Sequence, residues 1–441
     1  MENIKNNTAD KVSIKPQMLK GTVSVPASKS ALHRGIIAAA LSGGKCTIKN
    51  VSMSQDIEAT LRGIKAFGCK SAHDSKARTL TLSPQRTAKS SNNVTEIDCG
   101  ESGSTLRFLI PIALVPNMCG DVKRIRFIGH GRLMQRPLKP YIDMFDSHGI
   151  SYKKSGDTLE LYGTLKSGAY EIEGNVSSQF ITGLLFALPL LDGDSEITVL
   201  NGAESKGYID MTINALKQFG IEIENRNYIK YIIRGNQKYK TQNFIAEADY
   251  SQAAFFAVLS ALRGGIRLAN LRRDSLQGDK AIFPILASFG SQTRWTEDTA
   301  EILPAHLTGQ RIDVSNCPDL APILSVLGLY SEGTTVLCNA ARLRDKESDR
   351  IEAMETELRK LGAQVESTRD SLTIHGWGNR PAFRETEVSG RNDHRVVMSL
   401  AIAATLGSAP VVIDGAEAIA KSYPDFFNDL RRIGGRAEVL S

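Results

Sequence analysis

The stretch INALKQFG (residues 213–220) has the pattern of an amphipathic helix that ends at a glycine. A glycine commonly closes a helix because it adopts the left-handed conformation without steric cost. The pattern recurs along the chain, and successive closing glycines are 81, 71, 70, 72 and 72 residues apart. The equivalent segments are LRGIKAFG (61–68), YIDMFDSHG (141–149), IFPILASFG (282–290), METELRKLG (354–362) and FNDLRRIGG (427–435). The chain is therefore predicted to repeat one structural unit of about 72 residues.

A second, more apolar helical stretch precedes each of these helices. Each stretch opens with Ser, Asp or Asn, which are preferred helix N-caps. The segments after the closing glycines, such as IEIENRNYIKYIIRG (221–235), alternate apolar and polar residues as strands do. The predicted unit is helix, strand, helix, strands, present six times. The apolar stretches are SKSALHRGIIAAAL (28–41), SGSTLRFLIPIAL (102–114), SSQFITGLLFALPLL (177–191), DYSQAAFFAVLSAL (249–262), DLAPILSVLGLY (319–330) and NDHRVVMSLAIAATL (392–406).

Six such units are too many for one hydrophobic core, so we predict an α/β protein with two domains of three units each. The middle domain is expected to span residues 26–247. The strand-like segment KVSIKPQMLKGTVSV (11–25) is expected to join the C-terminal half, so the other domain comprises 1–25 and 248–441.

Composition excludes several classes of protein. The 54 basic and 48 acidic residues give a net charge of +6, but no basic stretch with interleaved aromatics indicates a nucleic-acid binder. The longest uncharged runs, 174–191 and 396–413, contain Gly, Pro or Ser and do not resemble membrane spans. The first residues lack the apolar core of a secretory signal, and the six widely spaced cysteines are typical of reduced, mostly buried thiols. These features predict a cytoplasmic protein.

The starts of the six apolar helices are the candidate functional positions. If the three such helices of one domain are buried together in a similar orientation, their N-termini converge on one face, where backbone N–H groups and helix dipoles favour anions. Two such faces would suit phosphates and carboxylates. The residues at these starts are Ser28-Lys29-Ser30 with Arg34, Ser102-Gly103-Ser104 with Arg107, Ser177-Ser178-Gln179, Asp319, and Asp393-His394-Arg395.

Each of these features also has a purely structural interpretation. Ser and Asp at helix starts are most often only caps. Arg34 and Arg107 lie within apolar helices and need partners, which favours anion binding for both. His394 alone would more often be a structural histidine. The charged run at 341–360 is either a solvated helix or an anion site that carries its own acid.

Other chemistries lack their motifs. Gly43-Gly44-Lys45 is followed by Cys46, so it is not a P-loop, and neither G-x-G-x-x-G after a strand nor G-x-S-x-G is present. The seven histidines show no metal-ligand spacing, and no metal or cofactor is predicted.

Taken together, the motifs resemble the EPSP synthase (3-phosphoshikimate 1-carboxyvinyltransferase) family over residues 12–436. That family has two inside-out α/β domains of three units each, joined by a double-crossing hinge. Its enzymes transfer the enolpyruvyl group of phosphoenolpyruvate to the 5-hydroxyl of shikimate 3-phosphate. The matching residues, in family order, are Pro26-Ala27-Ser28-Lys29-Ser30, His33-Arg34, GESGSTLR (100–107), Arg132, Arg136-Pro137, Ser177-Ser178-Gln179, Asp319, Lys346-Glu347-Ser348-Asp349-Arg350, Asn392-Asp393-His394-Arg395 and Lys421.

The resemblance also implies roles for individual residues. Asp319 would be the base on the attacking hydroxyl, with Glu347 and Lys29 in proton transfer. The middle domain would hold shikimate 3-phosphate, and the other domain would supply the phosphoenolpyruvate side and the catalytic carboxylates. The residues implied for shikimate 3-phosphate are Ser30, Arg34, Ser177, Ser178, Gln179, Ser205, Tyr208 and Lys346. Those implied for phosphoenolpyruvate are Lys29, Gly103, Arg132, Arg350, Arg395 and Lys421, and the substrate-binding set is completed by Asp319, Arg342 and His394. A monomer is expected.

Four positions depart from the commoner family pattern: Glu101, Ser104, Gly207 and Arg342. Arg342 stands where Asn often contacts the shikimate phosphate, so its role stays open, as does the response to phosphonate inhibitors beside Glu101 and Ser104. The alternative enzyme is the sister transferase acting on UDP-N-acetylglucosamine. Its loop typically carries a reactive Cys or Asp, whereas residues 129–137 here contain no cysteine, and Ser30 replaces its usual Asn. A non-enzymatic binder of anionic ligands would tolerate the loss of Asp319 and Glu347.

Overall fold

The computed structural model describes residues 10–85, 94–119, 124–378 and 385–440. The chain forms two compact units. Unit 1 comprises residues up to Pro26, Ala248–Ser275 and Asp279 onward, and unit 2 comprises Ala27–Glu247 with Leu276–Gly278. The backbone therefore passes from one unit to the other after Pro26 and again after Glu247, and it briefly re-enters unit 2 at Leu276–Gly278.

One repeat of unit 2 shows the pattern that all six share. It consists of β6 (Val94–Asp98), α3 (Gly103–Ala113), β7 (Arg124–Ile128), α4 (Lys139–His148), β8 (Ser151–Ser155) and β9 (Thr158–Tyr162). The strands form a four-stranded sheet in the order β6-β7-β9-β8, in which β6 and β7 are parallel and the other pairs are antiparallel. The predicted order of helix, strand, helix and two strands is confirmed. The strand before the first helix was not predicted.

The other two repeats of unit 2 have the same order of elements. One contains α1 (Lys29–Leu41), β3 (Cys46–Lys49), α2 (Gln55–Lys65), β4 (Cys69–Asp74) and β5 (Thr79–Pro84), with β14 (Phe244–Ile245) as its outer strand. The other contains β10 (Ala169–Glu173), α5 (Ser178–Ala187), β11 (Ser195–Leu200), α6 (Lys206–Gln218), β12 (Ile223–Arg226) and β13 (Lys230–Ile233). Short 3₁₀ helices lie at η1 (Leu133–Gln135) and η2 (Leu188–Leu190).

Unit 1 is built from three further repeats of this kind. The first contains β2 (Gly21–Ser24), α7 (Tyr250–Arg263), β15 (Ile266–Ala269), η3 (Gly278–Ala281), α8 (Ile282–Ser288), β16 (Gln292–Thr296) and β17 (Thr299–Leu303). The second contains β18 (Arg311–Asp313), η4 (Pro318–Leu320), α9 (Ala321–Leu329), β19 (Thr334–Cys338), η5 (Ala341–Asp345), α10 (Arg350–Lys360), β20 (Gln364–Ser367) and β21 (Leu372–His375). The third contains β22 (Thr386–Ser389), α11 (His394–Leu406), β23 (Val411–Asp414), η6 (Ala416–Lys421), α12 (Phe426–Arg432), β24 (Arg436–Leu440) and β1 (Lys11–Lys15).

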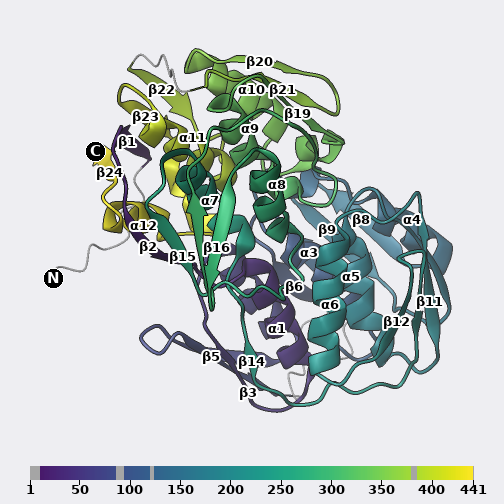
Figure 1. Cartoon of the computed structure of the whole chain (residues 1–441). Coiled ribbons are helices and arrows are strands. Elements are labelled where there is room, and N and C mark those ends of the chain that lie inside the picture. The colour runs from purple at the N-terminus through teal and green to yellow at the C-terminus, as the bar shows by residue number, and fades with distance from the viewer. Residues whose placement is uncertain (1–9, 86–93, 120–123, 379–384, 441) are drawn as a thin grey trace. The chain divides into compact units, whose positions relative to one another are not determined.

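The N-terminal strands complete sheets of the C-terminal half. β1 lies between β23 and β24, with Val12 opposite Ile413 on one side and Val439 on the other. β2 pairs in parallel with β15, so that Val23 lies opposite Leu268. Figure 1 shows β1 beside strands from the other end of the sequence and β2 beside β15. In unit 2, the outer strand β14 comes from the end of that unit and pairs with β3 near its start.

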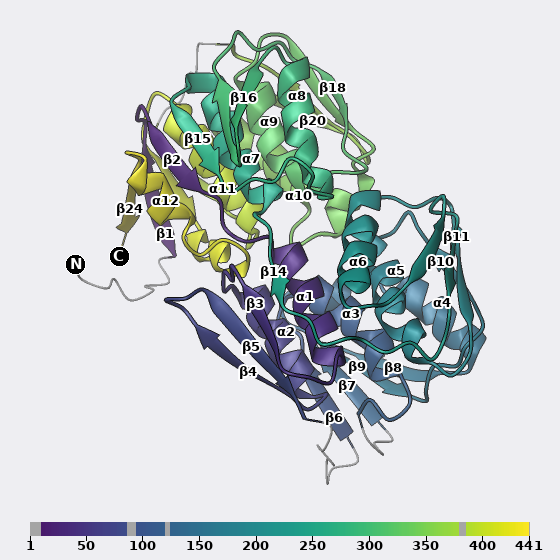
Figure 2. The same ribbon diagram turned by 60° about the horizontal axis from the view of Figure 1, so that its bottom comes forward.

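The apolar first helices form the interior of each unit. In unit 1, α7, α9 and α11 pack against one another, and every residue of α9 and α11 is buried. In unit 2, α3 packs on α5, while α1 packs on α2 and α6. The sheets lie outside these helices and alternate buried with more exposed residues, as in β9 and β10 (Figure 2). The fold is thus the expected α/β architecture with helices inside, and burial of the aliphatic side chains drives its formation.

Local helix signals are confirmed with one exception. All six closing glycines have positive φ, from 68° at Gly149 to 112° at Gly290. The caps of α1, α3, α5, α7 and α11 accept hydrogen bonds from backbone N–H groups near the start of their helices. Asp319 was expected to open its helix as well, but this is wrong. Pro318 begins a 3₁₀ turn that places Asp319 inside a helical segment, and α9 has no side-chain cap.

The six cysteines lie mostly in the interior of the protein. Cys46, Cys69, Cys99, Cys119 and Cys317 are buried, Cys338 is half-buried, and all six are free thiols. The prediction that the cysteines are mostly buried is therefore confirmed. Over the described parts of the chain, the helices are too short or too polar to cross a lipid bilayer.

Candidate active site

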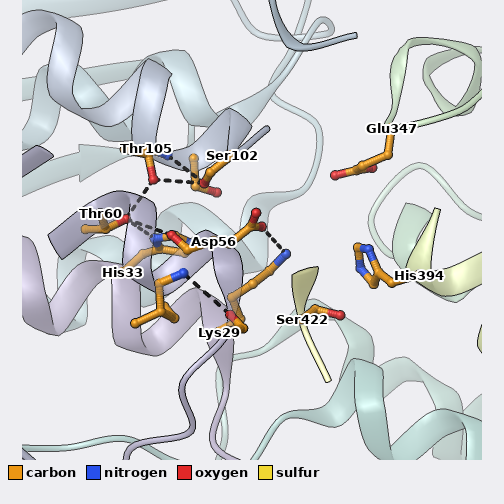
Figure 3. Close-up of polar contacts among 12 residues, drawn as sticks. Lys29, His33, Asp56, Thr60, Ser102, Thr105, Glu347, His394 and Ser422 are labelled. Atoms are coloured by element: carbon orange, nitrogen blue, oxygen red, sulfur yellow. Dashed lines mark hydrogen bonds and ion pairs between the residues drawn. The ribbon is translucent and has the colours of Figure 1, made fainter. Parts of the chain in front are cut away.

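In unit 2, Lys29 is the first residue of α1 and is held in place by α2. Its Nζ lies 2.6 Å from Oδ2 of Asp56, and both side chains are largely buried. Asp56 is in the first turn of α2, where the positive end of the helix dipole stabilises a carboxylate. The pair therefore fixes an ammonium group at the start of α1 (Figure 3). Sequence reasoning missed Asp56, although its place in the first turn of a predicted helix could have indicated a partner for a nearby cation.

The start of α3 lies against Arg136. A Cβ atom on Gly103 would come within 2.8 Å of Nη1 of Arg136, so a larger residue here would require the guanidinium to move. Arg136 is buried, and it brings a positive charge to the N-terminus of α3. The sequence motif had included Arg136 without assigning it a role. The side chain and the helix start together form a site suited to an anion.

The loop before η1 packs on the loop before α3. The backbone N–H of His130 donates to the carbonyl of Gly100 at 2.7 Å, and a Cβ on Gly131 would meet Oε2 of Glu101 at 2.7 Å. Arg132, which follows in this loop, is exposed. The two loops thus bring Gly103, Arg132 and Glu101 into one region of unit 2. Glu101 introduces a negative charge there, which is the departure from the family pattern noted above.

The starts of α3 and α5 are joined by Gln179. Its Nε2 donates to Ser104 at 3.0 Å, and its Oε1 accepts from Nη1 of Arg107 at 2.6 Å. Ser177 caps α5 through a bond from the N–H of Gln179, and Ser178 is buried beside it. The predicted convergence of helix starts is therefore confirmed for these two helices.

Arg34 is buried and directed toward α6. Its Nε donates to Thr212 at 2.9 Å, its Nη2 to the carbonyl of Tyr208 at 2.8 Å, and its Nη1 to the carbonyl of Ser30 at 2.8 Å. Burial lowers the pKa of Arg34 to about 10, so it remains charged at neutral pH. Ser205, one turn before Tyr208, has φ of 55° and is buried, a strained conformation of the kind found at binding sites. Ser30, Arg34, Ser205 and Tyr208 therefore lie in one region of unit 2.

In unit 1, three carboxylates surround one buried arginine. Arg350 donates from Nη1 to Asp319 at 2.8 Å, from Nη2 to Glu347 at 2.9 Å and from Nε to Asp393 at 2.8 Å. Burial disfavours its charge, but the three carboxylates outweigh this effect and raise the pKa of Arg350. The guanidinium thus organises both carboxylates that the sequence implies for catalysis.

Asp319 bridges Arg350 and Arg395. Its second oxygen accepts from Nη2 of Arg395 at 3.0 Å. Burial raises the pKa of Asp319, but Arg395, Arg350 and Lys346 outweigh burial and hold it well below its ordinary value. Because Asp319 does not cap α9, both of its oxygens serve these arginines. The carboxylate is therefore ionised at neutral pH.

Arg395 also joins the starts of the three central helices of unit 1. Its Nη2 donates to Ser251 of α7 at 3.0 Å, and its Nη1 donates to the carbonyl of Asp319, just before α9. Its own backbone N–H donates to the cap Asp393 of α11. His394 is buried at the same helix start. The predicted convergence of helix N-termini is confirmed in this unit.

Lys421 is held by a strained turn. Its Nζ donates to the backbone carbonyl and to Oδ1 of Asn392, both at 2.8 Å. Arg391 and Asn392 have φ of 53° and 52°, which is unfavourable for residues other than glycine. The buried carboxylate of Glu357 holds this turn by accepting from the N–H of Ser389 at 2.9 Å and from Nε of Arg391 at 2.8 Å. Sequence reasoning did not single out Glu357.

Glu357→Gln is expected to lower the free energy of unfolding by about 1–3 kcal/mol, because it weakens charge-assisted hydrogen bonds in a buried site. Urea denaturation measures this change. Glu352→Gln is the matched control, since Glu352 lies five positions earlier in α10, is exposed, and comes no closer than 3.6 Å to the Arg391 guanidinium. The control is expected to cost less than about 1 kcal/mol. Equal effects of both variants would mean that Glu357 does not hold the turn.

The charged run at 341–360 divides into two parts. Residues 350–360 form α10, with an i,i+4 pair between Glu355 and Arg359, while the preceding loop carries Lys346 and Glu347. The helical interpretation is thus confirmed for residues 350–360, although one face of α10 is buried, and the anion site in the preceding loop stays a prediction. Arg342, in η5, donates to the carbonyl of Ser315 at 2.5 Å, which directs it toward the loop that precedes Asp319.

The architecture is similar to that of solved enolpyruvyl transferases. An EPSP synthase from Acinetobacter baumannii solved at 2.37 Å superposes with a TM-score of 0.79 at 26% identity, covering 98% of this chain and all of that chain. The enolpyruvyl transferase NikO from Streptomyces tendae superposes with a TM-score of 0.75 at 16% identity, covering 98% and 99%, and this likeness concerns the fold alone. The fold and the helix starts with their cations thus define an enolpyruvyl-transferase-type protein.

The sequence comparisons narrow this class. The chain belongs to the EPSP synthase family, whose model, described as EPSP synthase (3-phosphoshikimate 1-carboxyvinyltransferase), matches residues 14–430. It is 45% identical over 442 residues to a 3-phosphoshikimate 1-carboxyvinyltransferase of Clostridium novyi (strain NT), covering 99% of this chain and 98% of that protein. It is 46% identical over 428 residues to the protein of that name from Clostridium acetobutylicum, covering 96% and 97%.

Proposed function

We propose that this chain transfers the enolpyruvyl group of phosphoenolpyruvate to the 5-hydroxyl of shikimate 3-phosphate, releasing phosphate and contributing to aromatic amino acid biosynthesis. The observation that carries the residue roles is the position of Asp319, whose carboxylate is held ionised by Arg350 and Arg395 at a convergence of helix starts. The family match supports the reaction.

The substrates would be held by the groups gathered in each unit. In unit 2, Arg34, Ser205 and Tyr208 lie together and would bind shikimate 3-phosphate with Ser30, Ser177, Ser178 and Gln179. The start of α3, with Gly103, Arg132 and Lys29, would bind phosphoenolpyruvate. In unit 1, Arg350, Arg395 and Lys421 are the residues that would contact phosphoenolpyruvate, and Lys346, Arg342 and His394 would also contact substrate. Arginine suits bidentate contacts to carboxylate and phosphate, and lysine provides a compact charge.

The chemistry requires proton transfer in two stages. In the addition, a bond forms between the 5-oxygen of shikimate 3-phosphate and C2 of phosphoenolpyruvate, while Asp319 takes the hydroxyl proton and C3 gains a proton from Lys29 or Glu347. In the elimination, the bond from C2 to the phosphate oxygen breaks, and the methyl carbon C3 returns a proton to whichever of Lys29 and Glu347 donated one. The hydroxyl proton held by Asp319 would then leave with the phosphate. The cations stabilise the anionic tetrahedral intermediate between these stages.

The low pKa of Asp319 makes it a weak base before substrate binds. Anionic groups of phosphoenolpyruvate beside Arg395 and Arg350 would compete for their positive charge and so raise the pKa of Asp319. Asp319 would thus become a strong enough base to accept the hydroxyl proton only when phosphoenolpyruvate is bound.

Phosphate release from phosphoenolpyruvate tests the proposal directly. With shikimate 3-phosphate as co-substrate, rapid release is expected, whereas UDP-N-acetylglucosamine in a parallel assay should give no more than the background rate. The absence of cysteine from residues 129–137 also favours the first acceptor. Release only with UDP-N-acetylglucosamine would establish the sister activity, and release with neither would favour a non-enzymatic binder. The cytoplasmic location and the monomeric state stay predictions.

A further inference from the structure

A buried chain of hydrogen bonds connects the three helices α1, α2 and α3 of unit 2. Nδ1 of His33 lies 2.7 Å from Oγ1 of Thr60, which lies 2.7 Å from Oγ1 of Thr105, and the Thr105 hydroxyl donates to Oγ of Ser102 at 2.8 Å. All four side chains are buried. Figure 3 shows the chain running from α1 through α2 to the start of α3. It ends at the residue that caps α3.

The donors in this chain follow one direction. Since the Thr105 hydroxyl donates to Ser102, Thr105 must accept from the hydroxyl of Thr60. The alternative acceptor for Thr60, the carbonyl of Asp56, is 3.4 Å away and competes poorly. Thr60 in turn accepts from His33, so the imidazole carries its proton on Nδ1.

The environment of His33 agrees with this assignment. Burial, Lys29 and Arg34 all lower the pKa of His33 well below its ordinary value, so the ring is neutral. Its Nε2 is buried and has no hydrogen-bond partner among the described residues. If Nδ1 carries the proton, Nε2 has only an unpaired lone pair, which costs less in a buried site than an unpaired N–H group. The imidazole ring also packs edge-on against Phe108, with ring centroids 6.4 Å apart.

Helix α2 supports two parts of the proposed phosphoenolpyruvate site at once. Asp56 in its first turn holds Lys29, and Thr60, one turn later on the same face, holds His33 and, through Thr105, the cap of α3. The residue after that cap is Gly103. The separation of Lys29 from the N-terminus of α3 is therefore set by α2.

We propose that Thr60 is a positioning residue for phosphoenolpyruvate, which acts through His33 and Thr105 to fix the start of α3 relative to Lys29. This inference rests on the proposed function. The chain of hydrogen bonds joins the α3 start to α1 and α2. Arg34 is held instead by Thr212 of α6, whose hydroxyl also bonds to the carbonyl of Tyr208. A loss at Thr60 therefore affects phosphoenolpyruvate more than shikimate 3-phosphate.

Thr60→Val tests the positioning role of Thr60, because valine has nearly the same shape as threonine but can neither donate nor accept a hydrogen bond. The KM for phosphoenolpyruvate is expected to rise about tenfold, with kcat and the KM for shikimate 3-phosphate changed by less than about threefold. Thr60→Ser, which keeps the hydroxyl, is expected to stay within about twofold of the unsubstituted enzyme. Thr405→Val is the control for loss of a buried hydroxyl, since the Thr405 hydroxyl donates locally, to the carbonyl of Ala401 in α11.

Nitrogen-15 NMR of the histidine rings provides a readout independent of turnover. His33 is expected to show a protonated Nδ1 and an unprotonated Nε2 in the unsubstituted protein, and to lose this state in folded Thr60→Val. An unchanged KM for phosphoenolpyruvate in folded Thr60→Val, or equal changes in all three kinetic constants, would overturn the inference while leaving the proposed function intact. If the unsubstituted protein fails to turn over shikimate 3-phosphate, the proposed function fails and this inference falls with it. A His33 ring protonated on Nε2 would refute the donor direction on which the inference depends.

Discussion

Lys29→Met is expected to lower kcat by about a thousandfold or more while the chain stays folded. The substitution keeps the length of the side chain but removes an ammonium group that the proposed mechanism uses both as a cation beside phosphoenolpyruvate and as a proton carrier. Losing a proton donor and a charge stabiliser each costs two or more orders of magnitude in typical enzymes. Phosphate release at saturating substrates measures kcat.

The fold should survive Lys29→Met because the partner carboxylate remains stabilised. Asp56 loses the ion pair at 2.6 Å but stays in the first turn of α2, near the positive end of that helix. Circular dichroism and urea denaturation check this point. Lys29→Arg is the matched control: it restores the charge but not the compact proton carrier, so binding of phosphoenolpyruvate should recover more than kcat does. A near-normal kcat in folded Lys29→Met would remove Lys29 from the mechanism.

Asp319→Asn should reduce kcat by about a hundredfold or more and change the KM for shikimate 3-phosphate by only a few-fold. A general base typically contributes this much, and asparagine cannot accept the hydroxyl proton. The amide oxygen can still accept one hydrogen bond from Arg350 or Arg395, so Asn disturbs the cluster less than Ala would. An unchanged kcat would refute the role of Asp319 as base.

The pH dependence of stability gives a second test of Asp319. A carboxyl group whose pKa is lower in the folded state stabilises the fold above its unfolded pKa, and this contribution is lost as pH falls through the folded value. Because the folded pKa of Asp319 lies well below 3.8, its contribution should be fully present near neutral pH, begin to decline as pH falls below the unfolded value, and be lost once pH falls through the folded value. Asp319→Asn should therefore reduce stability more at pH 7 than at pH 3, as measured by denaturation at both values.

The sequence by itself determined the repeated units and the types of residue at the helix starts. Caps and closing glycines act within one helical turn, so Ser28, Ser102 and Gly220 could be assigned from their neighbours. Family resemblance placed Lys29, Asp319 and Glu347 among the functional residues. Of the strands that precede the first helices, only β2 lay in a predicted segment. The others escaped prediction because these strands are short, only two residues in β14, and gain stability from pairing rather than from a local pattern.

Only the tertiary structure decided which charges meet. Asp56 pairs with Lys29 across 27 positions of the sequence, and Arg350 joins Asp393 across 43. The structure also showed that Asp319 belongs to a 3₁₀ turn rather than to a cap, which leaves its carboxylate to the arginines. Such partnerships depend on how separate helices pack, and the burial that strengthens them is a property of the assembled unit and not of any one segment.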